Sequence, residues 1–173
     1  MKTKIELGIW SNPQTDHKTW IWQDILPLPN VDLVCNANDL SSIPSNSMDE
    51  VFASHLIEHF YFNEVGEVLD EWVRVLKPGG KLTIKLPDFM MLWECIIDKT
   101  KFRKIPLGID TIEDWMCRIM ANDKEPPHMH INHYPYYWYQ GALERAGCTA
   151  TIERKWEWNV PEVIILAIKN EKN

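Results

Sequence analysis

Residues 63–87 constrain the fold of this 173-residue chain more than any other stretch. They read NEVGEVLDEWVRVLKPGGKLTIKLP. Apolar side chains in 63–76 recur at the spacing of one helical face, with Asn63 as the expected N-cap, and the KPGG segment 77–80 ends the helix. The short apolar run 81–87 then predicts a strand. A helix followed by a tight turn and a strand indicates a βαβ crossover, and hence an α/β sheet.

Four short apolar runs precede this unit and predict the first strands of the sheet. They are rich in β-branched or aromatic residues and cover 4–9, 19–25, 31–37 and 49–54. Strands that are apolar along nearly their whole length are typical of a parallel sheet covered on both faces. We therefore expect both faces of this sheet to be covered.

The second half of the chain is predicted to add helices and a closing hairpin. Helices are expected at 88–99, 110–121 and 134–146, with a loop that starts at 122 between the last two. The runs 149–158 and 161–170 predict two antiparallel strands joined at Asn159-Val160. The fold class is therefore α/β, with a seven-stranded mixed sheet, a C-terminal antiparallel hairpin and a helical insertion (88–133) between strands five and six. We expect 1–173 to form a single domain.

Composition and charge fit a globular protein of this size. Hydrophobic residues make up 45% of the chain and charged residues 25%. The formal net charge of −7 argues against a nucleic-acid-binding protein, which needs a basic surface to neutralise phosphates. No apolar run reaches the roughly 18 residues of a membrane span, and the cysteines are far apart with no CxxC pair. We expect a cytoplasmic protein with reduced thiols and no membrane partner.

Three motifs in the middle of the chain carry a family resemblance. They are IPSNSMDEVFASHLIEHF (43–60), VLDEWVRVLKPGGKL (68–82) and LPD (86–88). They resemble class I S-adenosylmethionine-dependent methyltransferases, and most closely the small predicted members of that family. The resemblance is dense over 43–88, looser over 4–42, and limited to topology over 134–170; 89–133 has no counterpart. It implies a Rossmann-like sheet and S-adenosylmethionine as cofactor, and we expect 88–133 to cover the pocket at the carboxyl ends of the strands.

The resemblance implies a cofactor site that starts at the first strand, in IELGIWSNP (5–13). The family places an acidic residue and a glycine-rich loop here, because the backbone must pass close to the ligand. Glu6, Gly8 and Trp10 match these positions, but Gly8 is the only glycine before Gly66. The stretch leading to the second strand is also too short for the usual helix. Trp10 either stacks on the ligand or fills its space.

Three further residues are cofactor candidates by the same resemblance. Asp24 lies at the end of the second predicted strand, where the family's acidic residue binds ribose hydroxyls through charge-assisted hydrogen bonds. Asn38 and Asp39 lie in NANDL (36–40), which corresponds to the segment that frames the adenine. Structural roles stay open for both carboxylates, because Asp24 could cap a turn and Asp39 could cap a short helix before Ser41.

The segment SHLIEHF (54–60) contains His55, Glu58 and His59 in the H-x-x-E-H order of inverted zinc peptidases. A zinc peptidase needs both imidazoles on one helical face, whereas His55 falls at the end of a predicted strand and no third ligand stands out. We therefore expect no metal. In the methyltransferase family this segment borders the reaction centre, which makes His55, Glu58 and His59 candidate catalytic residues. Alternatively, Glu58 and His59 cap the following helix and hold the loop.

A second histidine cluster lies in the predicted loop and comprises His128, His130 and His133. Three roles stay open for it: a metal site, polar contacts to substrate, or plain loop residues. Together with His55, these histidines are candidates for a general base in methyl transfer.

Two functions from different classes fit these observations. The first is an enzyme that transfers a methyl group from S-adenosylmethionine to a small molecule or saccharide, a substrate class favoured by the acidic charge and by relatives with the EHF pattern. The second is a methyltransferase-like scaffold or binding subunit that has lost its cofactor. The single glycine and the missing helix favour the scaffold, whereas Asp24, NANDL and the His55–His59 segment favour the enzyme. The oligomeric state leaves no signal in the sequence.

Overall fold

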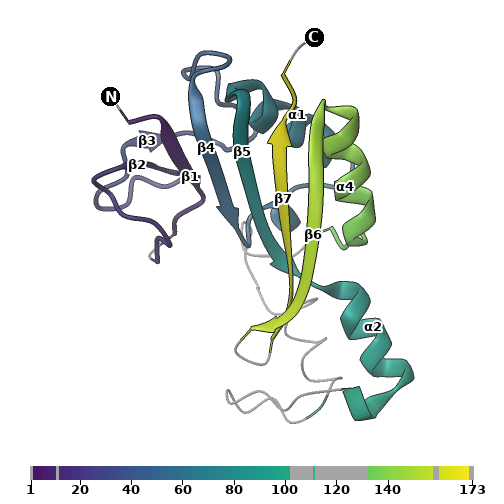
Figure 1. Cartoon of the computed structure of the whole chain (residues 1–173). Coiled ribbons are helices and arrows are strands. Elements are labelled where there is room, and N and C mark those ends of the chain that lie inside the picture. Colours follow the sequence, from purple (N-terminus) through teal and green to yellow (C-terminus); the bar gives the residue numbers. More distant parts are fainter. Residues whose placement is uncertain (1, 11, 102–110, 112–131, 158–159, 172–173) are drawn as a thin grey trace.

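The computed structural model of the chain describes residues 2–10, 12–101, 111, 132–157 and 160–171. One seven-stranded sheet runs through the molecule, with the strand order β3-β2-β1-β4-β5-β7-β6 (Figure 1). The strands are β1 (Lys4–Leu7), β2 (Trp20–Asp24), β3 (Leu33–Val34), β4 (Met48–Ser54), β5 (Leu76–Pro87), β6 (Cys148–Glu157) and β7 (Val160–Lys169). The predicted α/β class and the seven-stranded sheet are confirmed.

β7 makes the sheet mixed. The pairs among β1, β2, β3, β4 and β5 are all parallel. β7 lies between β5 and β6 and pairs antiparallel with both, as the pairs Pro87↔Glu162 and Glu157↔Val160 show. The predicted C-terminal hairpin is therefore confirmed, although Val160 is the first residue of β7 and not part of the connection.

The helix α1 (Val65–Val75) confirms the strongest local prediction. Five of its buried residues, Val65, Val68, Leu69, Trp72 and Val73, belong to the predicted stripe. The sixth predicted member, Leu76, is the first residue of β5, and Val75 is buried in the helix instead. The N-cap is Glu64 and not Asn63, and no side chain caps this end. Glu64 instead accepts a hydrogen bond from the Tyr61 N–H at 3.3 Å, so its carboxylate closes the preceding turn.

β5 begins earlier than predicted, because Leu76 already pairs with Met48 of β4. The register then shifts, and the next pair is Glu50↔Lys81. The KPGG segment (77–80) therefore bulges out of the strand and does not precede it. A bulge of this kind lets α1 pass directly into β5 without a separate loop.

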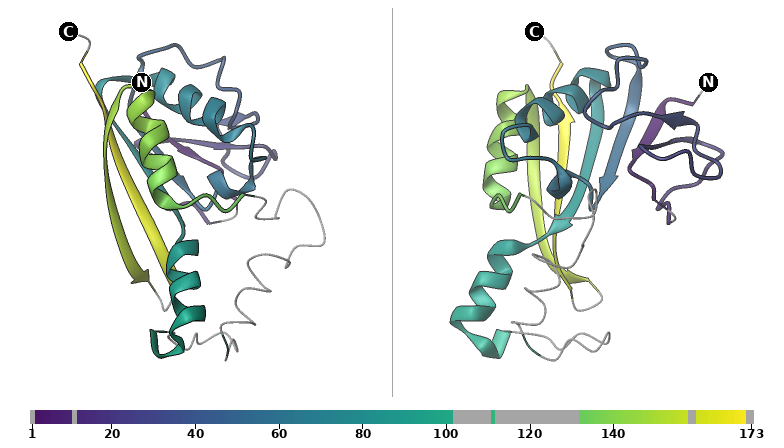
Figure 2. Two further views of the ribbon diagram at one scale, coloured as in Figure 1. Left: turned by 90° about the vertical axis from the view of Figure 1, so that its right-hand side faces the viewer. Right: turned by 180° about the vertical axis from the view of Figure 1, so that it is seen from behind.

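Two helices cover one face of the sheet. α1 and α4 (Tyr136–Arg145) lie on the same side in both views of Figure 2. The connections 8–19 and 25–32 contain no helix in their described residues, so neither puts a helical layer on the opposite side. Among the described residues, the expectation that both faces are covered holds at β1, where the consecutive residues Ile5, Glu6 and Leu7 are all buried. It is wrong for β5, β7 and β6.

The opposite side of β5, β7 and β6 is exposed along its middle. Strand register places Thr83, Leu166 and Thr151 next to one another there. Leu166 and Ile168 are each 37% exposed, and Thr149 and Thr151 are exposed as well. We call the surface formed by these five residues the open face.

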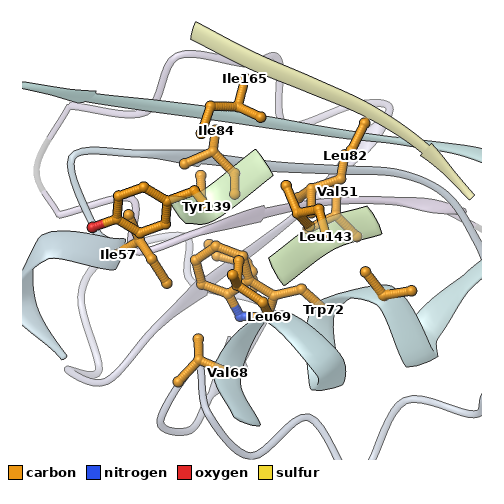
Figure 3. Close-up of a cluster of buried hydrophobic side chains, with 14 of the residues drawn as sticks. Val51, Ile57, Val68, Leu69, Trp72, Leu82, Ile84, Tyr139, Leu143 and Ile165 are labelled. Carbon is orange, nitrogen blue, oxygen red and sulfur yellow. The ribbon is translucent and has the colours of Figure 1, made fainter. Parts of the chain in front are cut away.

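The hydrophobic core fills the space between the sheet and the two helices. Figure 3 shows Trp72 and Leu69 of α1, with Tyr139 of α4, beneath the strand residues Leu82 and Ile84. All five side chains are buried, and the Trp72 indole N–H donates to the Ala37 carbonyl at 2.8 Å. Burial of each of these large apolar side chains contributes about 1.5–3 kcal/mol to stability.

The helical insertion begins with α2 (Phe89–Ile97), followed by a 3-10 turn, η2 (Lys99–Lys101). Asp88 caps α2 by accepting from the Met91 N–H at 2.9 Å, and Arg154 of β6 lies 2.5 Å from the same carboxylate. This ion pair attaches α2 to the C-terminal hairpin. The predicted helix 110–121 lies outside the described residues apart from Thr111.

Candidate functional site

A cavity of about 540 Å³ opens at the carboxyl ends of β1, β2 and β4. Loop residues that follow these strands form its walls, as expected for a ligand crevice in an open α/β sheet. Of the residues predicted from the sequence, Glu6, Gly8, Trp10, Asp24, Asn38, His55 and His59 line the cavity. Asp39 and Glu58 do not. The cavity lining includes no residue from the described part of 88–133.

Gly8 turns the chain sharply at the end of β1. Its φ of 64° lies in the left-handed region, which an L-residue adopts only with strain. A Cβ atom at this position would lie 2.8 Å from Leu56 Cδ1. Its N–H donates to Gln23 Oε1 at 3.1 Å. The single glycine of the loop is therefore at the position where the backbone needs one.

Trp10 follows in a left-handed conformation of its own, with φ of 49°. Its backbone N–H donates to Asp24 Oδ2 at 2.8 Å, and its side chain is 48% exposed at the cavity. A half-exposed indole beside a cavity is available to pack against a ligand. The strained backbone is held in place by the Asp24 carboxylate.

Glu6 acts on the loop that forms one wall of the cavity. Its buried carboxylate accepts hydrogen bonds from the Gln14 N–H at 2.7 Å and from the Thr15 N–H at 3.0 Å. The Thr15 hydroxyl donates to it as well, at 2.5 Å. These contacts compensate for the burial of the charge and attach the loop to β1.

Asp24 lies at the end of β2, as predicted, and is only 2% exposed. Besides the Trp10 N–H, its carboxylate accepts from the Leu26 N–H at 2.9 Å through Oδ1. Each carboxylate oxygen has a second lone pair, so both can still accept from a ligand hydroxyl. The turn-capping role and the ligand role are thus compatible in one side chain.

The NANDL segment divides between the cavity and the surface. Asn38 lines the cavity. Asp39 lies outside it and accepts from the Ser41 N–H at 3.1 Å, and these hydrogen bonds to Ser41 lower the pKa of Asp39. Asp39 therefore closes a local turn, and the short helix that it was expected to cap as an alternative does not form in this described part of the chain.

Gln23 is a cavity residue that the sequence did not reveal. Its buried side chain accepts from the Gly8 N–H and donates through Nε2 to the Cys35 carbonyl at 2.6 Å. It thereby joins the loops that follow β1 and β3. The position of Gln23 in an otherwise apolar strand, next to Asp24, could have indicated this role.

His55 lies directly after β4, with φ of 51° and its N–H donating to the Lys85 carbonyl at 2.9 Å. Its ring nitrogens face two carboxylates: Nδ1 is 3.3 Å from Glu58 Oε1, and Nε2 is 3.3 Å from Glu162 Oε1. Burial acts to lower the pKa of His55, but the hydrogen bonds to Glu162 and Glu58 outweigh it and raise the pKa to about 10. The two carboxylates beside the ring thus favour its protonated form.

Glu162 is the second residue that sequence reasoning missed. It belongs to β7, which is separated from β4 by β5, and it is 6% exposed. Its pairing with His55 depends on the antiparallel position of β7 in the sheet. A glutamate at the start of an apolar strand carries no local sign of that partner.

Asn132 holds the 3-10 turn η1 (Ile57–His59) in place. Its fully buried amide donates to the carbonyls of Ile57 at 2.7 Å and Phe60 at 2.9 Å. The Tyr139 hydroxyl donates to its Oδ1 at 2.5 Å. The Asn132 amide thus links α4 to η1 and fixes the position of Glu58 and His59. Nothing in the sequence indicated this role.

The second histidine cluster is only partly described. His133 is half-buried, and its ring packs edge-on against Phe89 with 4.4 Å between centroids. Burial lowers the pKa of His133. His128 and His130 lie outside the described residues. Within the described ranges, no group of three or more His, Cys, Asp or Glu side chains is arranged to hold a metal ion.

Comparisons with known proteins agree with this geometry. Residues 18–84 match the family model described as a methyltransferase domain. No protein with a curated description matches the sequence. In the described part of the chain, no helix is long and apolar enough to cross a membrane.

Several solved structures share the fold. A SAM-dependent methyltransferase from Archaeoglobus fulgidus superposes with a TM-score of 0.64 at 15% identity, over 97% of this chain and 86% of its own. The 1,6-didemethyltoxoflavin-N1-methyltransferase of Burkholderia thailandensis, with bound 1,6-didemethyltoxoflavin and S-adenosylhomocysteine, gives 0.63 at 11% identity, over 98% and 72%. The YcgJ protein of Bacillus subtilis gives 0.63 at 12% identity, over 99% and 93%.

At these identities the structural likeness concerns the fold. The domain match comes from the sequence and covers β2, β3, β4, α1 and most of β5. Together they show a match to a methyltransferase domain over 18–84 and, over nearly the whole chain, the fold of S-adenosylmethionine-dependent methyltransferases.

Proposed function

We propose that this protein transfers a methyl group from S-adenosylmethionine to a small molecule or saccharide. The observation that carries the proposal is the Asp24 carboxylate, which lines the cavity at the end of β2 with lone pairs still available. The same carboxylate also accepts from the Trp10 and Leu26 N–H groups, but a scaffold would not need its remaining lone pairs to line a cavity.

The residues present fit the cofactor. Asp24 would bind the ribose hydroxyls, and the left-handed Gly8 lets the backbone approach the ligand without a side chain in the way. Asn38 lies where the adenine ring would be framed, and the exposed Trp10 indole would pack beside the ligand. A cavity of about 540 Å³ is within the range of cofactor and small-molecule sites.

The bound cofactor would supply a sulfonium methyl group that already carries the driving force for transfer. The chain's own residues then have to orient the acceptor and exclude water, since alignment of two reactants accounts for much of such a rate enhancement. The candidates for this end of the cavity are His55 and His59, which follow β4. Glu58 does not line the cavity, but it contacts His55 and helps to hold that ring in place.

A small acceptor is supported by size and charge. The net charge of −7 disfavours polyanions such as RNA or DNA as substrates. The Burkholderia thailandensis neighbour is itself a small-molecule methyltransferase by its description. The saccharide alternative rests on the EHF pattern alone. Incubation with labelled S-adenosylmethionine and separate pools of saccharides, small metabolites and RNA would test the class, and transfer into RNA alone would overturn it.

A reduced, cytoplasmic setting is part of the proposal. Cys35, Cys95 and Cys148 are free thiols in the described structure. Widely spaced free cysteines are typical of proteins that are kept in reducing compartments.

Calorimetric titration of S-adenosylmethionine and S-adenosylhomocysteine into the protein tests the cofactor. We expect saturable heat and a rise in the unfolding temperature, because a ligand that binds the native state stabilises it. Absence of both at millimolar ligand would contradict the enzyme and support the scaffold function instead.

A further inference from the structure

Both ring nitrogens of His55 are engaged by carboxylates. Glu58 is fully buried and Glu162 is 6% exposed, and each places one oxygen 3.3 Å from a ring nitrogen. A neutral imidazole has one N–H donor and one acceptor nitrogen. Two carboxylate acceptors therefore match only the doubly protonated ring, unless one of the carboxylates carries the proton.

Other charged groups surround this arrangement on neighbouring elements. On β6, Glu157 lies near Glu162, and a hydrogen bond from Lys155 lowers the pKa of Glu157. Lys85 of β5 also favours the charged form of Glu157. His133 lies within electrostatic reach of Glu58. Lys155 and Lys85 thus balance Glu157, whereas the two carboxylates in contact with His55 favour a positive charge on its ring.

We propose that His55 is a positioning residue, held as an imidazolium between Glu58 and Glu162, that fixes the rim of the cofactor cavity and accepts no proton from the methyl acceptor. The positive charge of His55 is inferred from the two carboxylate contacts. Its role at the rim of the cavity rests on the proposed function. The contact spans the sheet from β4 to β7 across β5. Glu162 thereby becomes part of the site although it does not line the cavity.

The arrangement also accounts for the backbone of His55. A left-handed conformation at a non-glycine residue is strained and persists where the surroundings hold it in place. Three contacts do so here: the N–H bond to the Lys85 carbonyl and the two carboxylate contacts of the ring. Leu56 and His59, which line the cavity just after this turn, depend on the same geometry.

Because His55 does not take it up, a proton lost by the methyl acceptor must leave the site by another route. His59 also lines the cavity and is the other imidazole that does so among the described residues. An acceptor that reacts as an anion or a neutral amine needs no base in the transfer step itself.

Nitrogen-15 NMR of the histidine rings tests the proposal directly, without any need for substrate or cofactor. The His55 signals are assigned by their loss in His55→Gln. We expect the wild-type ring at pH 8 to show two protonated nitrogens, and we expect Glu162→Gln to move its titration down by at least one pH unit. Glu153→Gln removes a carboxylate from an exposed position of β6 and serves as the matched control, with no change expected.

A neutral His55 tautomer in the wild type at pH 8, with ordinary titration near pH 6.5, would overturn the proposal. The wild-type spectrum decides this even if Glu162→Gln does not fold. The affinity for S-adenosylhomocysteine tests the role of His55 at the rim of the cavity. We expect Glu162→Gln to weaken this affinity severalfold and Glu153→Gln to leave it unchanged. Equal affinity in both variants would overturn that role. If the wild type bound no cofactor at all, the proposed function would fail while the NMR result still stood.

Discussion

The Asp24 carboxylate accepts a hydrogen bond from the Trp10 backbone N–H at 2.8 Å. This contact joins the end of β2 to the loop after β1, so one side chain both shapes the cavity wall and faces its interior. Substitutions at Asp24 therefore have to separate the loss of a ligand contact from the loss of the loop.

Asp24→Asn should weaken S-adenosylmethionine binding by tenfold or more, roughly 1.5–3 kcal/mol, because the ribose hydroxyls lose a charged acceptor. Asp24→Ala should weaken it further, since the N–H groups of Trp10 and Leu26 both lose their partner. Calorimetry measures the affinity for S-adenosylmethionine. Urea unfolding measures how much the contact between Asp24 and the loop after β1 contributes to stability. Asp16→Asn, at a carboxylate outside the cavity, should leave affinity unchanged; equal losses at both positions would point to a general charge effect.

Gly8→Ala should destabilise the fold by about 1–3 kcal/mol, because an alanine in the left-handed region is strained. Its Cβ would also displace Leu56, which lines the cavity, so S-adenosylmethionine affinity should fall as well. Gly66→Ala is the matched control. Gly66 lies in α1 with nothing within 4 Å of an added Cβ, so alanine there should stabilise by about 0.5–1 kcal/mol. Similar effects of both substitutions on urea unfolding would contradict the role given to Gly8.

Asn132→Ala should lower the free energy of unfolding by roughly 3 kcal/mol. It leaves the carbonyls of Ile57 and Phe60 and the Tyr139 hydroxyl without their partner inside the core. Asn170→Ala, which removes a surface hydrogen bond to Thr149, should stay within about 0.5 kcal/mol of the wild type. Chemical denaturation of both variants checks the difference, and a mild effect at Asn132 would show that η1 is held by other contacts.

The stability of the wild type should fall relative to His55→Gln as pH rises through the alkaline range. The folded-state pKa of His55, about 10, lies above its ordinary value of 6.5, so the native state binds the extra proton. This contribution is fully present below about pH 6.5 and is lost as pH rises toward about 10. Urea unfolding of both proteins between these limits measures the difference. A constant gap across the range would mean that His55 does not change charge on unfolding.

The sequence predicted what depends on local pattern. The stripe of α1 follows from residues three and four apart, and Asp24 was found because it ends an apolar strand. Glu162 was not found, because its partner depends on β7 lying between β5 and β6. The cover of the sheet was mispredicted in part, because it was inferred from the apolar runs at 4–9, 19–25, 31–37 and 49–54. Those runs carry no information on the surroundings of β5, β6 and β7, where Leu166 and Ile168 are exposed on the open face.

The open face separates the residues of β5, β6 and β7 into two sets that experience different surroundings. Leu82, Ile165 and Ala150 are buried in the core, whereas on the opposite side Thr151 is exposed and Thr83 is half-buried. Because consecutive side chains alternate between the two sides, changes in one set leave the other almost untouched. Substitutions on the open face, in natural or engineered variants, can therefore change the charge and polarity of this surface with little effect on the packed layer. The strands that carry it, β5, β6 and β7, are not those at whose carboxyl ends the cavity opens.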